Sequence, residues 1–152
     1  MTVDAAPPVI RPAGPADRDD WGELFREYAA GGDITLRDEK LDVVWSWVLD
    51  GEAQTRCLLA HSGGRPRGFV HYRRFERPIT ASAGLWIDDL YVAPATRGQG
   101  LAGALIDAVR AEARRDGHDV VRWTTRETNE DAQRLYDRVA VRAPVIVYST
   151  TP

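Results

Sequence analysis

Two adjacent aspartates, Asp88 and Asp89, interrupt the otherwise apolar run LWIDDLYV. A carboxylate here can take a proton from a substrate, directly or through a water molecule, or it can hold a cationic group. Because strand residues alternate between faces, the two side chains should lie on opposite faces unless a β-bulge intervenes. The sequence leaves both as candidates, and the structural alternative for either is exposure to solvent or an ion pair with an arginine such as Arg122.

A glycine-bearing loop follows the same run in the segment APATRGQGLAGALIDAV. A strand that leads through such a loop into a helix presents free N–H groups at the positive end of the helix dipole, which favours an anion. Gly98 and Gly100 would let the backbone approach a phosphate, and Arg97 would add a permanent charge. The loop lacks the lysine of a P-loop and the three glycines of a dinucleotide fingerprint. A tight strand-to-helix turn is the structural alternative.

Composition excludes several classes of protein. A chain of 152 residues with 43% apolar and 28% charged residues predicts one globular domain, residues 1–152, with residues 1–8 loose. The net charge of -3 gives no general attraction to nucleic acid or membranes. With no signal-like N-terminus or membrane-length apolar run, we expect a cytoplasmic protein. The single cysteine, Cys57, is expected to be a buried hydrophobe, and no metal site is expected.

Apolar periodicity predicts alternating strands and helices. Strands are expected at residues 7–13, 56–62, 67–75, 85–92, 120–125 and 145–150, and helices at 14–32, 35–51, 101–116 and 129–140. The order predicts an α/β (α+β) fold, with a mixed central sheet of about six to seven strands and helices on both faces.

Two motifs carry a family resemblance. Arg97, Gly100 and Ala102 fit the pattern Arg/Gln-x-x-Gly-x-Gly/Ala, which resembles the pyrophosphate-binding motif of the GNAT superfamily of N-acetyltransferases. DDLYVAP is similar to the family's fourth strand, and WTTRETNEDAQRLYDRVA to its fifth strand, loop and last helix. The order of elements agrees along nearly the whole chain. The string LYDRVA, followed by one strand, resembles the branch that contains yeast-type histone and polyamine acetyltransferases.

The resemblance implies an N-acetyltransferase that moves the acetyl group of acetyl-CoA to a primary amine by direct attack in a ternary complex. The acceptor would be a small molecule such as a polyamine or an amino acid. In this family the fourth and fifth strands separate, and the pantetheine arm lies in the gap; here it would pair with Leu90, Tyr91 and Val92. The pyrophosphate would lie on the backbone of Arg97, Gly98, Gln99, Gly100, Leu101 and Ala102.

The resemblance also implies catalytic roles. Tyr136 occupies the family's tyrosine position and would protonate the departing thiolate, since a thiol pKa of about 8.5 and a tyrosine pKa of about 10 permit the transfer. The alternative for Tyr136 is a core aromatic. Asn129 would bond the pantetheine arm, cap the last helix, or do both. Asp88 aligns with the residue that acts as base in some members, and Asp89 would hold a cationic substrate. Apart from the resemblance, His71 is expected to be an ordinary strand residue, and the alternative is that it lines the substrate groove.

Two other functions stay open: a protein or histone-tail lysine acetyltransferase, and a non-catalytic acyl-CoA-binding module. The presence of Tyr136, Asp88 and Asp89 speaks against the module. Family members usually have two strands after the last helix, whereas one candidate, VIVYST, with both faces apolar, follows here. Because an open apolar edge promotes association, we expect a homodimer. The other expected partners are acetyl-CoA and a small amine or peptide acceptor, with no nucleic acid or membrane.

Overall fold

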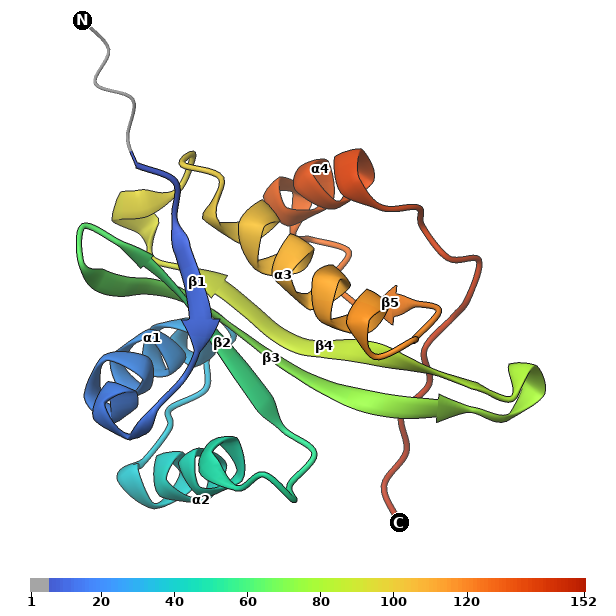
Figure 1. Ribbon diagram of the computed structural model, residues 1–152, viewed down its shortest axis with the longest axis horizontal. Coiled ribbons are helices and arrows are strands. Elements are labelled where there is room, and N and C mark those ends of the chain that lie inside the picture. Colours follow the sequence, from blue (N-terminus) through green and yellow to red (C-terminus); the bar gives the residue numbers. More distant parts are fainter. Residues whose placement is uncertain (1–5) are drawn as a thin grey trace, which may run out of the picture.

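Helices cover both faces of one mixed sheet in the computed structural model, which describes residues 6–152 (Figure 1). The strands lie in chain order: β1 (Val9–Pro12), β2 (Arg56–Ser62), β3 (Arg65–Arg77), β4 (Ser82–Val92) and β5 (Val121–Arg122). β1 to β4 pair antiparallel, and β5 runs parallel to β4. The predicted class, a mixed sheet covered on both faces, is confirmed.

Four α-helices form the covering layers. α1 (Arg18–Ala30) and α2 (Asp38–Leu49) lie on one face, and α3 (Leu101–Arg115) lies on the other with α4 (Glu130–Val139) beside it (Figure 1). Three 3-10 turns, η1 (Pro15–Asp17), η2 (Pro78–Thr80) and η3 (Pro94–Thr96), each begin with a proline. Proline suits this place because its φ is preset and the first N–H of a helix has no partner in any case.

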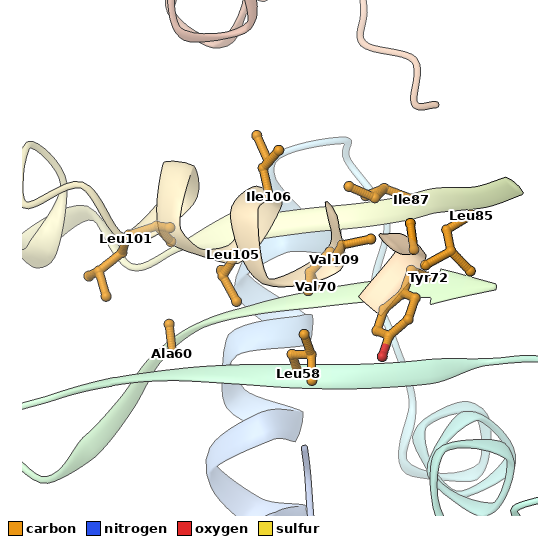
Figure 2. Packing of buried hydrophobic residues seen from close by; sticks show 12 residues of the cluster. Leu58, Ala60, Val70, Tyr72, Leu85, Ile87, Leu101, Leu105, Ile106 and Val109 are labelled. Carbon is orange, nitrogen blue, oxygen red and sulfur yellow. The ribbon is translucent and has the colours of Figure 1, made fainter. Parts of the chain in front are cut away.

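The core beneath α3 holds the loop and the helix start in place. Leu101, Leu105 and Val109 repeat every four residues along α3 and are almost fully buried against β2, β3 and β4 (Figure 2). Burial of each such side chain contributes about 1.5–3 kcal/mol relative to exposure. The predicted inner face of this helix is confirmed.

A second core, rich in aromatic side chains, lies under α1 and α2. Trp21, Trp45 and Phe69 are buried there together with Cys57. Burial raises the pKa of the Cys57 thiol, so the group stays protonated and acts as a small hydrophobe, as predicted. Trp47 differs from these residues because it is largely exposed.

The sheet has five strands rather than six to seven, because the C-terminal segment forms none. The prediction of a strand at residues 145–150 is wrong: residues 140–152 contain no helix or strand. A strand needs a hydrogen-bonding partner, and no strand of residues 6–139 pairs with this segment. It leaves α4 as an extended trace (Figure 1). The predicted strand at residues 120–125 is likewise reduced to β5.

The start of the chain is described only in part. The expectation that residues 1–8 are loose falls largely on residues 1–5, which lie outside the described residues. Residues 6–8 belong to no helix or strand. Among residues 6–152, no helix has the length and apolar character needed to span a bilayer.

Candidate active site

One edge of β4 is open along its second half. β5 pairs with β4 only at Leu85 and Trp86, although β4 continues to Val92. Residues 87–92 therefore have no strand partner on that side within the described chain; we call this stretch the open edge of β4. It contains the three residues expected to bind the pantetheine arm, Leu90, Tyr91 and Val92. An unpaired edge of this kind can accept an extended ligand as a further strand.

The loop between β4 and α3, residues 93–100, presents unpaired backbone donors at its C-terminal end; we call it the glycine loop. The expectation that the Arg97 backbone binds the pyrophosphate is not met, because its N–H donates to the Pro94 carbonyl over 3.3 Å. Gly98 and Gly100 have φ of 81° and 77°, the left-handed region that favours glycine. No N–H of residues 98–103 donates to another described residue, and the first helical bond runs from the Ala104 N–H to the Gly100 carbonyl. Such N–H groups at a helix N-terminus form a binding site for an anion.

Arg97 links the open edge to the glycine loop. Its Nε donates to the carbonyl of Val92 over 3.2 Å, and its guanidinium lies over the ring of Tyr91. Leu101 is one of the residues expected to bind the phosphates. Its side chain is buried, so it can offer only its backbone N–H. Gln99 is exposed and accepts a bond from the Ser62 hydroxyl.

A β-bulge in β4 places both aspartates on the side of α1 and α2. The pairing register shifts by one residue, since His71 lies opposite Asp89 while Tyr72 lies opposite Ile87, which leaves Asp88 as the extra residue. Ile87 accordingly packs in the core beneath α3, whereas Asp89 bonds to His71 on the other side of the sheet. The sequence predicts the two aspartates on opposite faces of the sheet unless a β-bulge intervenes. The bulge is present, so they share a face.

The two aspartates differ in their partners. Both carboxylate oxygens of Asp88 accept from Arg73 Nε, at 3.0 and 3.2 Å, so its arginine partner is not Arg122. Burial raises the pKa of Asp88, and the Arg73 guanidinium opposes part of that rise. Arg73 also lies over the ring of Trp86. The Asp88 carboxylate is thus already paired with the Arg73 guanidinium.

Asp89 is held from beneath by a buried histidine. His71 Nδ1 lies 2.9 Å from Asp89 Oδ2, and His71 Nε2 accepts from the indole Nε1 of Trp21, also over 2.9 Å. The His71 side chain is 2% exposed in β3, so it is a buried strand residue, and the alternative that it lines the groove is wrong. It reaches the site only through Asp89. The part played by Trp21 gave no signal in the sequence, because its place on the apolar stripe of α1 predicts a core residue.

A second tyrosine, Tyr28 of α1, lies beside Asp89 and is also absent from the residues that sequence reasoning selects. Burial and the Asp89 carboxylate raise the pKa of Tyr28, and Tyr136 and Arg126 act on the same hydroxyl. These four side chains come from α1, β4, α4 and the loop before α4. Asp89 and Tyr136, far apart in the sequence, thus both lie close enough to Tyr28 to raise its pKa.

Tyr136 and Asn129 occupy positions consistent with more than one role. The Tyr136 ring packs edge-on against Trp123, with ring centres 5.4 Å apart, and burial raises the pKa of its hydroxyl. A raised pKa keeps that hydroxyl protonated and able to donate a proton. Asn129 Oδ1 accepts from the Ala132 N–H, so Asn129 does cap α4. The side-chain NH2 group of the Asn129 amide donates to no described residue.

Comparison with known families identifies the family to which the chain belongs. The model of the acetyltransferase (GNAT) family matches residues 18–140, and the chain therefore belongs to that family. It is an acetyl-CoA-dependent N-acetyltransferase, with acetyl-CoA as its co-substrate.

Individual relatives agree with this assignment. The chain is 27% identical over 142 residues to the D-amino-acid N-acetyltransferase HPA3 of Saccharomyces cerevisiae, covering 92% of this chain and 88% of the relative. Two solved structures share its fold. A ribosomal-protein-alanine N-acetyltransferase from Brucella melitensis biovar Abortus has a TM-score of 0.81 at 23% identity, covering 96% of this chain and 99% of the other. The aminoglycoside N-acetyltransferase AAC(6')-Iy in complex with CoA has a TM-score of 0.83 at 16% identity, covering 99% of each chain.

Proposed function

We propose that the protein transfers the acetyl group of acetyl-CoA directly to a small primary amine, with both substrates bound together. The observation that carries this proposal is the continuity of two backbone surfaces that lack a strand or helix partner within residues 6–152. The open edge of β4, at residues 90–92, leads directly into the unpaired N–H groups of residues 98–103. The first would bind the pantetheine arm, and the second, with Arg97, the pyrophosphate.

The reaction needs a group that accepts a proton from the amine and another that donates a proton to the sulfur of CoA. An alkylamine has a pKa of about 10.4 and must lose a proton before it attacks. We propose that Asp89 receives this proton, directly or through water, because Asp89 lies beside Tyr28 whereas Asp88 is paired with Arg73. As the new C–N bond forms and the C–S bond breaks, Tyr136 gives its proton to the sulfur of CoA. The attacking nitrogen then loses its second proton, which returns through water to the ionised Tyr136 oxygen.

We further propose that the acceptor is an amino acid. Asp89 offers a negative charge for its ammonium group, and Arg126 offers a positive charge for its carboxylate. The Arg126 guanidinium lies against Gly32, where a Cβ would come within 2.8 Å of it. Its side chain forms no ion pair within residues 6–152. The yeast relative, whose name gives D-amino acids as its substrates, supports the same class.

A panel of amines tests the acceptor. The protein is incubated with acetyl-CoA and with D- and L-amino acids, their amides, polyamines or basic peptides, while release of free thiol is followed. We expect amino acids to react best and to lose most of their advantage over the amides in Arg126→Gln, since the amides lack the carboxylate. Arg138→Gln on the exposed side of α4 is the control.

Each outcome of this panel separates the candidates. A preference for polyamines, or equal loss for amino acids and amides in Arg126→Gln, would contradict the amino-acid proposal. A preference for basic peptides would favour the protein or histone-tail alternative. Binding of acetyl-CoA without acetylation of any amine would favour the non-catalytic module.

We propose that the working unit is a cytoplasmic homodimer built on this one domain. The support is the C-terminal segment, whose apolar side chains are largely uncovered by the described residues 6–152. Val145, Ile146, Val147 and Tyr148 are 67–87% exposed. Such a segment is a hazard for non-specific association unless it pairs with a partner. A second copy could supply the missing strand across a two-fold axis.

Light scattering tests the dimer. We expect the protein to have twice the mass of one chain, and Ile146→Asp to reduce it to a monomer because a charge would be buried in the shared strand. Thr150→Asp, which adds the same charge outside the apolar stretch, should leave the dimer intact. A wild-type monomer at high micromolar concentration, with or without acetyl-CoA, would exclude the proposal.

A further inference from the structure

Two hydrogen bonds define the protonation of the buried ring of His71. The indole N–H of Trp21 can only donate, so His71 Nε2 must present its lone pair to it at 2.9 Å. The remaining ring proton is then on Nδ1, where it donates to Asp89 Oδ2 at 2.9 Å. A proton on Nε2 would place two donors face to face in a site from which water is excluded. Trp21 thereby selects the neutral Nδ1–H form.

Packing holds the ring in this orientation. Its centre lies 4.6 Å from that of Phe69 and 4.9 Å from that of Phe25, and Trp21 contacts the same cluster. A flip of the ring would break both hydrogen bonds, and its side chain is only 2% exposed. The chain Trp21–His71–Asp89 is therefore a rigid connection from the interior of α1 to the carboxylate at the bulge.

We propose that His71 is a positioning residue, oriented by Trp21, which binds Oδ2 of Asp89 and so directs the other oxygen, Oδ1, toward the space between Tyr28 and the acceptor amine. The inference rests on the proposed function of Asp89, and the family motif includes neither His71 nor Trp21. An aspartate at a bulge has several rotamers available. The buried N–H selects one of them before substrate arrives, which lowers the entropic cost of reaching the reactive geometry.

Trp21→Phe tests the connection at its far end. The change keeps an apolar ring but removes the N–H, so His71 is free to carry its proton on either nitrogen. Trp45→Phe is the matched control, because Trp45 is the same residue type in the same core, with its ring 4.8 Å from that of Trp21. We expect kcat/KM for the amine to fall about tenfold in Trp21→Phe and to change little in the control. KM for acetyl-CoA should stay constant in both.

Two substitutions of His71 separate positioning from packing. His71→Leu fills the space without a donor, and we expect at least a tenfold loss in kcat/KM for the amine. His71→Asn places an amide N–H where Nδ1 lies, and should recover most of that loss, although it fits the apolar pocket less well. Equal activity in the two variants, or equal loss in Trp21→Phe and Trp45→Phe, would overturn the proposal.

A spectroscopic measurement does not depend on any acceptor being found. Long-range ¹H–¹⁵N correlation spectra of the protein labelled in histidine report which ring nitrogen carries the proton, and His71→Asn assigns the signal. We expect the Nδ1–H form in the wild type and a mixture of forms in Trp21→Phe. A proton on Nε2 in the wild type would refute the proposed chain even if the enzyme acetylates amino acids. If no amine reacts while the Nδ1–H form is seen, the proposed function fails and the hydrogen-bonded chain stands.

Discussion

We expect Gly100→Val to lower the affinity for acetyl-CoA by about 10²-fold or more, and titration calorimetry would measure the change. Nothing lies within 4 Å of the position of a Cβ at Gly100, so a branched side chain would occupy the space above the unpaired N–H groups. In the proposed complex the phosphates of CoA occupy that space. Hydrogen bonds to charged groups contribute about 1.5–3 kcal/mol each, so the loss of two accounts for a change of this size.

The control for this variant must carry the same backbone strain. Valine at Gly100 is unfavourable in itself, because φ there is 77°. Gly117, just after α3, has φ of 71° and equally open surroundings. Gly117→Val should therefore lower the melting temperature comparably while binding acetyl-CoA normally. If a folded Gly100→Val protein binds CoA like the wild type, the glycine loop is not the phosphate site.

Tyr136→Phe lowers kcat by about 10²- to 10⁴-fold, the usual cost of losing a general acid. The affinity for CoA should hardly change, because the ring and its contact with Trp123 remain. In the wild type the acid is lost only as pH rises through its folded pKa. Since burial raises that pKa above the ordinary value of 10.0, the tyrosine-dependent fall in kcat should lie in the strongly alkaline range.

Tyr72→Phe is the matched control for this result. Its hydroxyl donates to Glu112 in the core beneath α3, and Tyr72 lies on the side of the sheet away from Asp89. We expect lower stability and normal turnover. Normal turnover of Tyr136→Phe on a good acceptor would show that Tyr136 is a packing residue and that solvent or another group protonates the thiolate.

The features that could be predicted from the sequence are those set by near neighbours in the chain. The stripe of Leu101, Leu105 and Val109 and the glycines before it predict a helix and its loop, and both are present. The sequence could not predict that Asp88 and Asp89 lie on the same face of the sheet, because the β-bulge depends on how β4 pairs with β3. Trp21 and His71 are fifty residues apart, so their hydrogen bond exists only in the tertiary structure.

The wrong prediction of a last strand has the same physical origin. Four consecutive apolar residues at 145–148, three of them β-branched, suit a strand with two apolar faces, but the pattern says nothing of whether a partner strand is present. In the described chain none lies beside this segment. A local pattern is thus a reliable guide to what a segment can become, and the pairing decides whether it does so.

The open edge of β4 also bears on how stable the protein would be with and without its co-substrate. If the pantetheine arm of acetyl-CoA pairs with this edge, the folded protein is more stable with acetyl-CoA bound than without it. A ligand that binds only the native state at a hundred times its Kd adds about 2.7 kcal/mol to the free energy of unfolding. Changes of 1–2 kcal/mol are enough to alter protein abundance several-fold through proteolysis. When acetyl-CoA is scarce, the enzyme would lose its substrate and part of its protection from degradation together, so its amount would follow the supply of acetyl groups.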